Sequence, residues 1–335
     1  MKNAKNKQRP TIRDVAREAG VSYQTVSRVI NNSGGVSPST RIRVLKAVEK
    51  LDYRPNRVAQ ILQTERSQTL EVVMPYFGFN RVLYDMARAA HQRGYNLVIS
   101  AIDSDEFPQA LESAEARFVD GLILTPLFPF IDDYDELVRL THGIPFVQIG
   151  APLGAPFPSV IYDHAQGARL ATQHLIDLGH RQIAEISGPL LSYDASARHE
   201  GWQATLREND IPLQPCIEAD FTIEGGYRAM NELLDSGATF SAVFAGNDSM
   251  AFGIQTALRE RGLRVPDDIS LVGFDDIPEA AHLVPGLTTV RQDFQLLGQL
   301  AVEYVLNLIE NRDTPIYQRV LSPKLVVRSS TRAIG

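Results

Sequence analysis

Short apolar runs alternate with amphipathic segments along residues 67 to 325, and this pattern constrains the fold more than any other feature of the chain. The helical segments often end in glycine, as in HQRGY (91–95) and LIDLGH (175–180). Strand–helix alternation of this kind predicts a doubly wound α/β fold with parallel sheets, and roughly 260 residues suffice for two such lobes. The predicted buried strands are residues 70–74, 97–99, 121–124, 145–147, 183–186, 242–245 and 269–272.

The first 66 residues follow a different pattern, typical of a small all-α unit. Apolar residues at helical spacing predict a first helix, which ends where Gly20 permits a tight turn. Ser22 is a favourable N-cap for a second helix, so that the two form a helix-turn-helix. Ser37 and Pro38 begin a third helix, which runs to about Leu51. The predicted core of this unit is Ile12, Val15, Ala16, Ala19, Val26, Val29, Ile30, Val44, Leu45 and Val48.

Charge is divided unevenly between these two parts of the chain. Residues 1–66 hold fourteen Lys and Arg against five Asp and Glu, whereas the remainder holds nineteen against thirty-five. A basic unit joined to an acidic one indicates a nucleic-acid-binding module attached to a domain with another task. The alternative is a solvated basic tail, which the apolar periodicity of the unit opposes.

The exposed face of the second helix holds side chains suited to contact DNA. Tyr23, Gln24 and Arg28 lie in the half of a recognition helix that reaches base edges. Arg can bond guanine O6 and N7 together, and Gln can pair with adenine. A solvated helix face is the competing interpretation, but the turn glycine, the caps and the charge favour DNA. Short polar groups suited to phosphate oxygens accompany them: Ser22, Thr25, Ser27 and Asn31.

The sequence of residues 56–63 predicts a further helix of about two turns. A helix of this length is too short to be stable alone. Asn56 can cap this helix, and it would form when packed against DNA or against its copy in a second subunit. An apolar side chain can wedge between base steps in the minor groove, and Leu62 is the candidate. The other expected DNA contacts here are Arg57, Ala59 and Gln60. An inert linker, the alternative, would more often be rich in Gly, Ser or Pro. We therefore expect a DNA-binding domain at 1–55, a hinge at 56–66 and a two-lobed domain at 67–335.

Several classes of function find no support in the sequence. No run of about 18 apolar residues predicts a membrane span, and the basic N-terminus leads into no secretory signal. The single cysteine, Cys216, excludes a disulfide framework and a Cys-rich zinc site, so a cytoplasmic location is expected. Glycine-rich nucleotide motifs, G-x-S-x-G and metal-type His/Glu clusters are missing, so neither a cofactor, a metal nor enzymatic activity is expected. Scattered histidines such as His164 and His180 are interpreted as surface or capping groups.

Polar residues that follow the predicted strands are candidates for a ligand site, because ligands of open α/β sheets bind beyond the carboxyl ends of the strands. These candidates are Tyr76, Thr125, Ser192, Asp194, Arg198, Asn247, Asp275 and Gln292.

The segments VSYQTVSRVIN (21–31) and NRVAQIL (56–62) resemble the recognition and hinge helices of the LacI/GalR family of bacterial repressors. The resemblance implies a homodimer that binds double-stranded operator DNA, with paired hinge helices in the minor groove. It further implies a domain similar to a periplasmic sugar-binding protein, with two lobes and three crossovers, and an effector that is a small carbohydrate or glycoside. Further blocks similar to the family are SARHEGW (196–202), FAGNDSMAFG (244–253), LVGFDD (271–276) and TTVRQDF (288–294).

The resemblance also implies which residues contact the effector. Carboxylates and amides can exchange hydrogen bonds with neighbouring hydroxyls, and Arg donates a rigid fork. Phe294 is expected to pack against the apolar face of a sugar ring. Tyr76 and Phe79, in the aromatic segment 74–81, either stack on a ring or pack internally. The implied polar contacts are Arg198, Asn247, Asp275 and Gln292.

Four positions depart from the founding member of the family. Gly35 replaces a DNA-contacting histidine, which puts the preference for flanking bases in doubt. Gly150 replaces an effector-binding aspartate, Phe221 a tryptophan and Asp194 a serine. We hypothesise that a carboxylate for sugar hydroxyls has moved from one wall of the effector site to another. The alternative is that Asp194 caps the helix that begins near Ala195.

Oligomeric state and effector class leave alternatives open. The segment KLVVRSSTRAIG (324–335) ends without the leucine-heptad tail that makes the founding member a tetramer, so a dimer on a pseudo-palindromic operator is expected. A purine-type corepressor or an activator role would suit the same fold. A sugar-binding transport protein is a further alternative, which the DNA-binding unit opposes.

Overall fold

The computed structural model of the chain describes residues 10–30, 34–54, 66–75, 80–125 and 133–334. The chain divides into two units, Met1–Ser67 and Gln68–Gly335, which are taken in turn. The predicted hinge contacts Asn56, Arg57, Ala59, Gln60 and Leu62 lie outside the described residues, as do Asn31, Tyr76 and Phe79.

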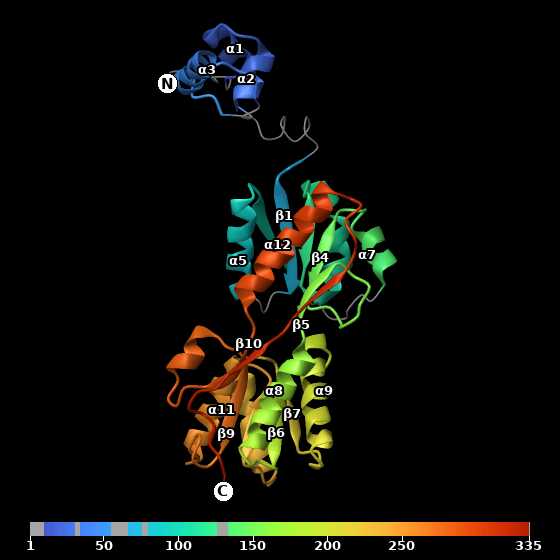
Figure 1. Cartoon of the computed structure of the whole chain (residues 1–335), viewed down its shortest axis with the longest axis vertical. Helices are drawn as coiled ribbons and strands as arrows, with labels where there is room; N and C mark the ends of the chain where they lie inside the picture. The colour runs from blue at the N-terminus through green and yellow to red at the C-terminus, as the bar shows by residue number, and fades with distance from the viewer. Residues whose placement is uncertain (1–9, 31–33, 55–65, 76–79, 126–132, 335) are drawn as a thin grey trace, which may run out of the picture. The chain divides into compact units, whose positions relative to one another are not determined.

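The described residues of the first unit form three helices (Figure 1), namely α1 (Ile12–Ala19), α2 (Tyr23–Ile30) and α3 (Pro38–Lys50). Gly20 ends α1 with φ +63°, a left-handed conformation that glycine adopts without strain. The Ser22 hydroxyl begins α2 by accepting a hydrogen bond from the Thr25 N–H at 3.2 Å. The predicted helix-turn-helix is therefore confirmed, with both ends of its turn fixed by local chemistry.

The core of the first unit follows the predicted pattern with one exception. Val15, Val26 and Val44 are fully buried at its centre. The prediction that Leu45 belongs to this core is wrong, because its side chain is 51% exposed. Leu45 is rotated by about 100° from Val44 around the axis of α3, and the buried Ala47 takes the inward position in the next turn.

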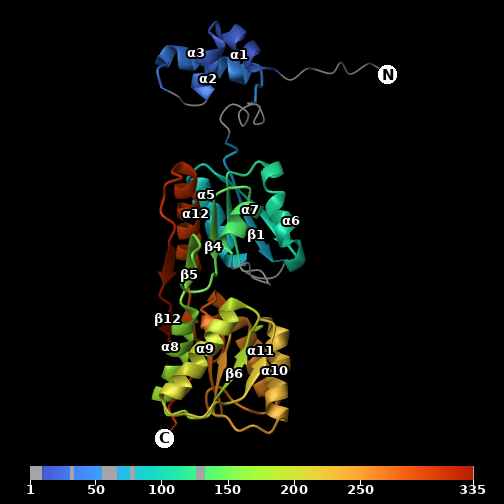
Figure 2. The same cartoon turned by 90° about the vertical axis from the view of Figure 1, so that its right-hand side faces the viewer.

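The first lobe of the second unit is a six-stranded sheet in the order β11-β5-β4-β3-β1-β2, with every neighbouring pair parallel. Helices α5 (Asn80–Gln92) and α12 (Phe294–Glu310) cover one face, and α6 (Phe107–Glu112) and α7 (Tyr134–Leu140) cover the other (Figure 2). The strands are β1 (Thr69–Pro75), β2 (Asn96–Ile102), β3 (Gly121–Leu124), β4 (Phe146–Ile149), β5 (Ser159–Tyr162) and β11 (Gln318–Leu321).

The second lobe repeats this plan with the order β12-β10-β9-β8-β6-β7, in which only the β10–β12 pair is antiparallel. Helices α8 (His164–Asp177) and α9 (Tyr193–Glu208) cover one face, and α10 (Ile223–Asp235) and α11 (Asp248–Glu260) cover the other. The strands are β6 (Ile183–Ser187), β7 (Cys216–Glu218), β8 (Ala242–Ala245), β9 (Ser270–Asp275), β10 (Thr288–Arg291) and β12 (Lys324–Val326).

Three crossovers join the lobes, from β5 to α8, from β10 to α12 and from β11 to β12. The Tyr162 hydroxyl fastens the first two together, because it accepts a hydrogen bond from the Asp293 N–H at 2.7 Å and lies 3.2 Å from the Asp293 carbonyl oxygen. The predicted fold class, a helical unit followed by a two-lobed α/β domain with parallel sheets, is confirmed. Within the described residues, the helices are too short or too polar to cross a bilayer.

Candidate functional site

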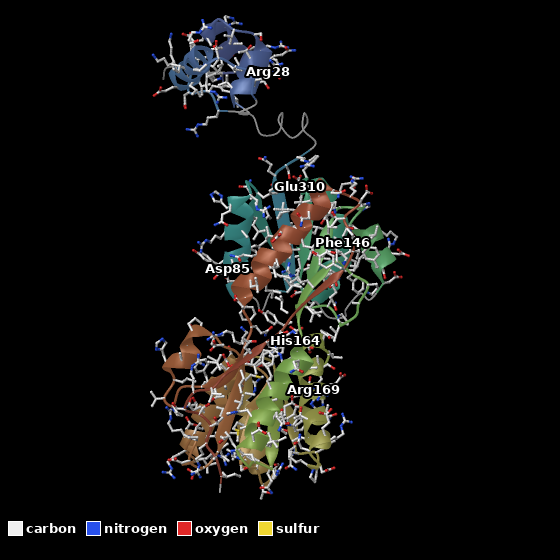
Figure 3. The ribbon with its side chains drawn as sticks, in the orientation of Figure 1. Arg28, Asp85, Phe146, His164, Arg169 and Glu310 are labelled. Carbon is white, nitrogen blue, oxygen red and sulfur yellow. The ribbon has the colours of Figure 1, made fainter. Side chains whose placement is uncertain are left out.

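The outer face of α2 presents the side chains expected to read DNA. Val26 and Val29 are buried, which leaves Tyr23, Gln24 and Arg28 exposed on the opposite side of the helix. Figure 3 shows Arg28 on this helix. The arrangement offers one planar cation and one amide on a rigid, capped helix, which is the chemistry that base edges require.

The short hydroxyl side chains around α2 are less exposed than those three. Ser22 is exposed, whereas Thr25 and Ser27 are half-buried. The hydroxyls of Ser22 and Thr25 lie 2.9 Å apart and hydrogen-bond each other. These two groups therefore stabilise the start of the helix, and each keeps further acceptor capacity for a phosphate-bound water or a donor.

In the second lobe, a buried polar cluster gathers at the carboxyl ends of β6, β8, β9 and β10. Arg198, from α9, lies at its centre and is 5% exposed. Its Nε donates to His164 Nδ1 at 3.2 Å, and its Nη2 lies 3.6 Å from Asp275 Oδ1. Its Nη1 donates to the Gly246 carbonyl oxygen. Two hydrogen bonds and one ion pair, in three directions, hold the guanidinium in one orientation.

Two aromatic rings lie close to this guanidinium. Its central carbon lies 3.9 Å from the centroid of the Phe274 ring and 5.8 Å from that of the Phe221 ring. The Phe221 ring in turn lies against Gly188, where an added Cβ would come within 2.2 Å of it. A buried cation near the face of an aromatic ring is stabilised by the ring quadrupole. Neither ring contact with Arg198 was foreseen in the sequence.

Asp194 faces His164 across the same cluster, with 3.2 Å between Asp194 Oδ1 and His164 Nε2. Asp194 is 7% exposed, and its Oδ1 has no hydrogen-bond partner of good geometry among the described residues. Burial raises the pKa of Asp194, but the interactions with His164 and with the Arg198 guanidinium outweigh burial and hold the pKa below its usual value. The group is therefore an ionised carboxylate with a free acceptor position.

The interpretation of Asp194 as a helix cap is wrong. Helix α9 begins at Tyr193, its N-cap residue is Ser192, and the Ser192 side chain makes no capping hydrogen bond. Asp194 thus lies inside the first turn and points to His164 rather than to backbone N–H groups. A carboxylate in that turn also benefits from the partial positive charge at the helix N-terminus.

Asp275 and Gln292 form the side of the cluster nearest β10. Gln292 Nε2 donates to Asp275 Oδ1 at 2.7 Å, and Gln292 is 7% exposed. Burial raises the pKa of Asp275 above its usual value, although Arg198 and Gln292 act against that rise. The last residue of β9 also has φ +110°, so its backbone departs from regular strand geometry where the side chain enters the cluster.

Asn247 lies next to the cluster but is largely engaged in holding the backbone. Its Oδ1 accepts from the Met250 N–H at 2.8 Å as the N-cap of α11, and its Nδ2 donates to the Phe221 carbonyl oxygen at 3.0 Å. One amide hydrogen is left for another acceptor. Phe294 starts α12 and is half-buried against the core of the first lobe.

The interpretation of the scattered histidines as surface or capping groups is wrong for two of them. His164 is 5% exposed at the point where β5 leads into α8 (Figure 3), and His180 is 1% exposed between Ser241 and Ser270. Sequence reasoning missed His164 because it also missed β5, whose four residues precede it in the chain. The run Tyr-Asp-His directly after an apolar stretch was the available signal.

Asp248 is a further buried carboxyl, which the sequence analysis did not single out. Its Oδ2 accepts from the Ile277 N–H at 2.9 Å, and its Oδ1 accepts from the Thr289 hydroxyl at 2.5 Å. Burial, reinforced by the nearby charge of Asp275, raises the pKa of Asp248 to about 8. The group ties α11 to β10 and to the loop after β9.

Both units of the chain match families of known proteins, and relatives span the two units together. Residues 11–56 match the family described as bacterial regulatory proteins, lacI family, and residues 172–331 match the periplasmic binding protein-like domain. The chain is 36% identical to the lactose operon repressor of Escherichia coli (strain K12), over 96% of this chain and 91% of that protein. It is 35% identical to the transcriptional repressor PurR of Haemophilus influenzae, over 97% and 99% of the two chains.

The structural comparison agrees with these matches. A crystal structure of the lac repressor dimer bound to operator and the anti-inducer ONPF superposes with a TM-score of 0.90 at 35% identity. The match covers 97% of this chain and 100% of that one. At this identity the likeness extends beyond fold class to the whole order of units.

Proposed function

Since the chain belongs to the LacI family of bacterial regulatory proteins, and is a transcriptional repressor of that family, we propose that a small carbohydrate or glycoside controls its affinity for operator DNA. The two DNA-binding domains of a homodimer contact the two halves of a pseudo-palindromic operator. The effector binds one state of the two-lobed domain better than the other and so shifts the equilibrium between them.

Operator recognition is assigned to the exposed face of α2 in the major groove. Arg28 donates two hydrogen bonds to a guanine, and Gln24 exchanges bonds with a neighbouring base. The net positive charge of residues 1–66 adds sequence-independent attraction to the phosphates. The domain boundaries proposed with this function are 1–55 for the reader, 56–66 for the hinge and 67–335 for the effector and dimer domain.

The observation that carries the effector proposal is the buried cluster around Arg198. An ionised Asp194 with a free acceptor position lies beside a fixed guanidinium donor. Adjacent sugar hydroxyls both donate and accept, so one ring can satisfy a carboxylate and a cation together. Phe294 and Phe221 offer apolar surface for the carbon face of the ring. The relative named for the lactose operon supports the same class, whereas PurR keeps a purine as the alternative.

Exposed apolar side chains on the first lobe support the proposed homodimer. Strand β2 is an edge strand, and its Val98 and Ile99 are 43% and 50% exposed. Tyr84, on the adjacent helix α5, is 71% exposed. An unprotected edge with apolar side chains is a surface that monomeric proteins avoid. The substitution Tyr84→Glu is expected to shift sedimentation toward monomer and to weaken operator binding.

The function is tested by a thermal-shift screen of sugars, glycosides and purines on the full chain. Each stabilising compound is then added to a fluorescence-anisotropy assay with an operator duplex at fixed salt. The proposal expects a carbohydrate to raise the melting temperature and to change operator affinity by about 5- to 150-fold, the range typical of allosteric coupling. Stabilisation by purines alone would replace the carbohydrate with a purine corepressor, and binding without any change in operator affinity would refute allosteric control.

A further inference from the structure

A second cluster of potential ligands lies in the second lobe, away from the Arg198 cluster. Glu185 of β6 and Cys216 of β7 are direct neighbours in the register of two parallel strands, and His199 of α9 covers them. The Glu185 Oε2 lies 2.5 Å from His199 Nδ1, and the Cys216 Sγ lies 3.7 Å from the same nitrogen. One ligand atom from each residue falls within 4.8 Å of the other two.

The geometry does not suit a nucleophilic triad. A Cys–His–acid relay needs the thiol on one ring nitrogen and the acid on the other. Here both the carboxylate and the thiol approach Nδ1. Three donors of different chemistry whose ligand atoms lie within 4.8 Å of one another are instead an arrangement that can hold a metal ion.

An unused lone pair points to the same conclusion. Glu185 is fully buried, and its second oxygen, Oε1, has no hydrogen-bond partner among the described residues. His199 pairs only with Oε2, so Oε1 remains a buried polar atom without a partner, which is costly. A metal ion bound by the carboxylate would supply that partner.

We propose that Glu185, His199 and Cys216 bind one zinc ion per chain, with a fourth position open to water. Oxygen, nitrogen and sulfur donors together suit a borderline-soft cation such as zinc and exclude magnesium as a competitor. Zinc bond lengths place tetrahedral ligand atoms roughly 3.3–3.6 Å apart, close to the observed separation of Sγ and Nδ1. The hydrogen bond between Glu185 and His199 lengthens when zinc displaces its proton.

The neighbouring side chain supplies the outer support of such a site. The side-chain nitrogen of Gln203 lies 2.8 Å from His199 Nε2. Once Nδ1 holds zinc, Nε2 carries the proton, and a turn of the Gln203 amide presents its oxygen as the acceptor. The site would tie α9 to β6 and β7. Because Arg198 adjoins His199, zinc binding would also stiffen the helix that carries the Arg198 cluster.

Thiol reactivity gives a direct test, because Cys216 is the only cysteine in the chain. The full chain, freed of metal with a chelator, is titrated with zinc against a chromogenic chelator and is then treated with a thiol reagent. We expect one equivalent of zinc per chain, a higher melting temperature and at least about tenfold slower modification of Cys216. Magnesium is expected to change none of these, and cobalt is expected to show a thiolate charge-transfer band.

Variants separate this site from adventitious binding. Glu185→Gln and Cys216→Ser are each expected to abolish the zinc-dependent rise in melting temperature. His174→Gln, on the neighbouring helix α8, removes a histidine bonded to Thr331 and is expected to keep the rise. Zinc binding that leaves Cys216 fully reactive in the unmodified chain would overturn the proposal, whatever the folding of the variants. So would variants that bind zinc as tightly as the parent.

Discussion

At the scale of single residues, Arg198 compensates the buried polar and charged groups of the second lobe. Arg198 contacts His164, Gly246 and Asp275 and lies close to two aromatic rings. Removing one member of a buried charge network typically costs about 3–5 kcal/mol, because its partners are left uncompensated. Such a network is a poor way to gain stability, which favours a binding role for the residues that form it.

Arg28→Ala is predicted to weaken binding to the specific operator by about 1–3 kcal/mol, since it removes a bidentate contact to a base. Anisotropy titrations at one salt concentration, with specific and random duplexes, measure the difference. Arg17→Ala serves as the matched control, because that exposed arginine lies on α1 and pairs with Asp14. Equal losses on both duplexes would assign Arg28 to phosphate contact instead.

Asp194→Asn is predicted to weaken binding of the identified effector by about 1.5–3 kcal/mol, the range for a hydrogen bond to a charged group. The change keeps the shape of the side chain and removes the charge that faces His164. Isothermal titration of the effector gives the affinity, and urea unfolding of the same variant gives the stability separately. An unchanged affinity would contradict the placement of Asp194 in the effector site.

At the scale of elements, helices α8 and α9 pack through a close backbone approach. Gly201 lies on α9, and a Cβ added there would come within 2.4 Å of the Ala165 carbonyl oxygen of α8. That atom belongs to the backbone and cannot rotate away. The glycine is therefore required by the distance between the two helices.

Gly201→Ala is predicted to lower the free energy of unfolding by about 1–3 kcal/mol, the usual effect of overpacking. Chemical denaturation of the full chain, followed by the fluorescence of the adjacent Trp202, measures it. Gly34→Ala is the control, because an added Cβ at Gly34 would meet nothing within 4 Å. A Gly201 variant as stable as the Gly34 variant would mean that the helices move apart without cost.

For the whole molecule, Asp248 is predicted to make stability fall as the pH rises. Its pKa is about 8 in the folded protein against 3.8 for the exposed carboxyl, so the native state holds a proton that the unfolded state has lost. Its contribution is complete below about pH 4 and is lost as the pH rises through 8. The slope is at most about 1.4 kcal/mol per pH unit.

Unfolding in urea at several values between pH 5 and 9 measures this effect as a difference between the parent and Asp248→Asn. Burial lowers the pKa of His174 and of His180, and their effect runs in the opposite direction below about pH 6.5. Both proteins share that effect, so the difference isolates Asp248. The stability advantage of the parent should shrink with rising pH, and a constant difference would contradict the assignment.

The sequence alone determined the local features of this protein. Helix caps, a turn glycine and apolar periodicity depend on residues a few positions apart, so α1 to α3 and seven strands were predictable. The prediction that residues 97–99 form a buried strand is wrong, because β2 lies at the edge of its sheet and leaves Val98 and Ile99 exposed. Short edge strands such as β7 and β12 were missed, because a three-residue, half-exposed strand has no apolar run to reveal it. Arg198, Asn247, Asp275 and Gln292 were candidates as polar residues that follow strands, and the resemblance to the family singled them out from the other candidates.

Only the tertiary structure decided which distant groups meet. His164 lies beside Asp194 and Arg198 because the first crossover leads from β5 to the start of α8, near the carboxyl ends of the strands in the second sheet. Glu185 and Cys216 meet because β6 and β7 are paired, although 31 positions separate them in the chain. Contacts of this kind depend on the order of strands in the sheet and on helix packing. The local sequence pattern does not fix either of these. The identity of a side chain is local, whereas its neighbours, its burial and its pKa are properties of the fold.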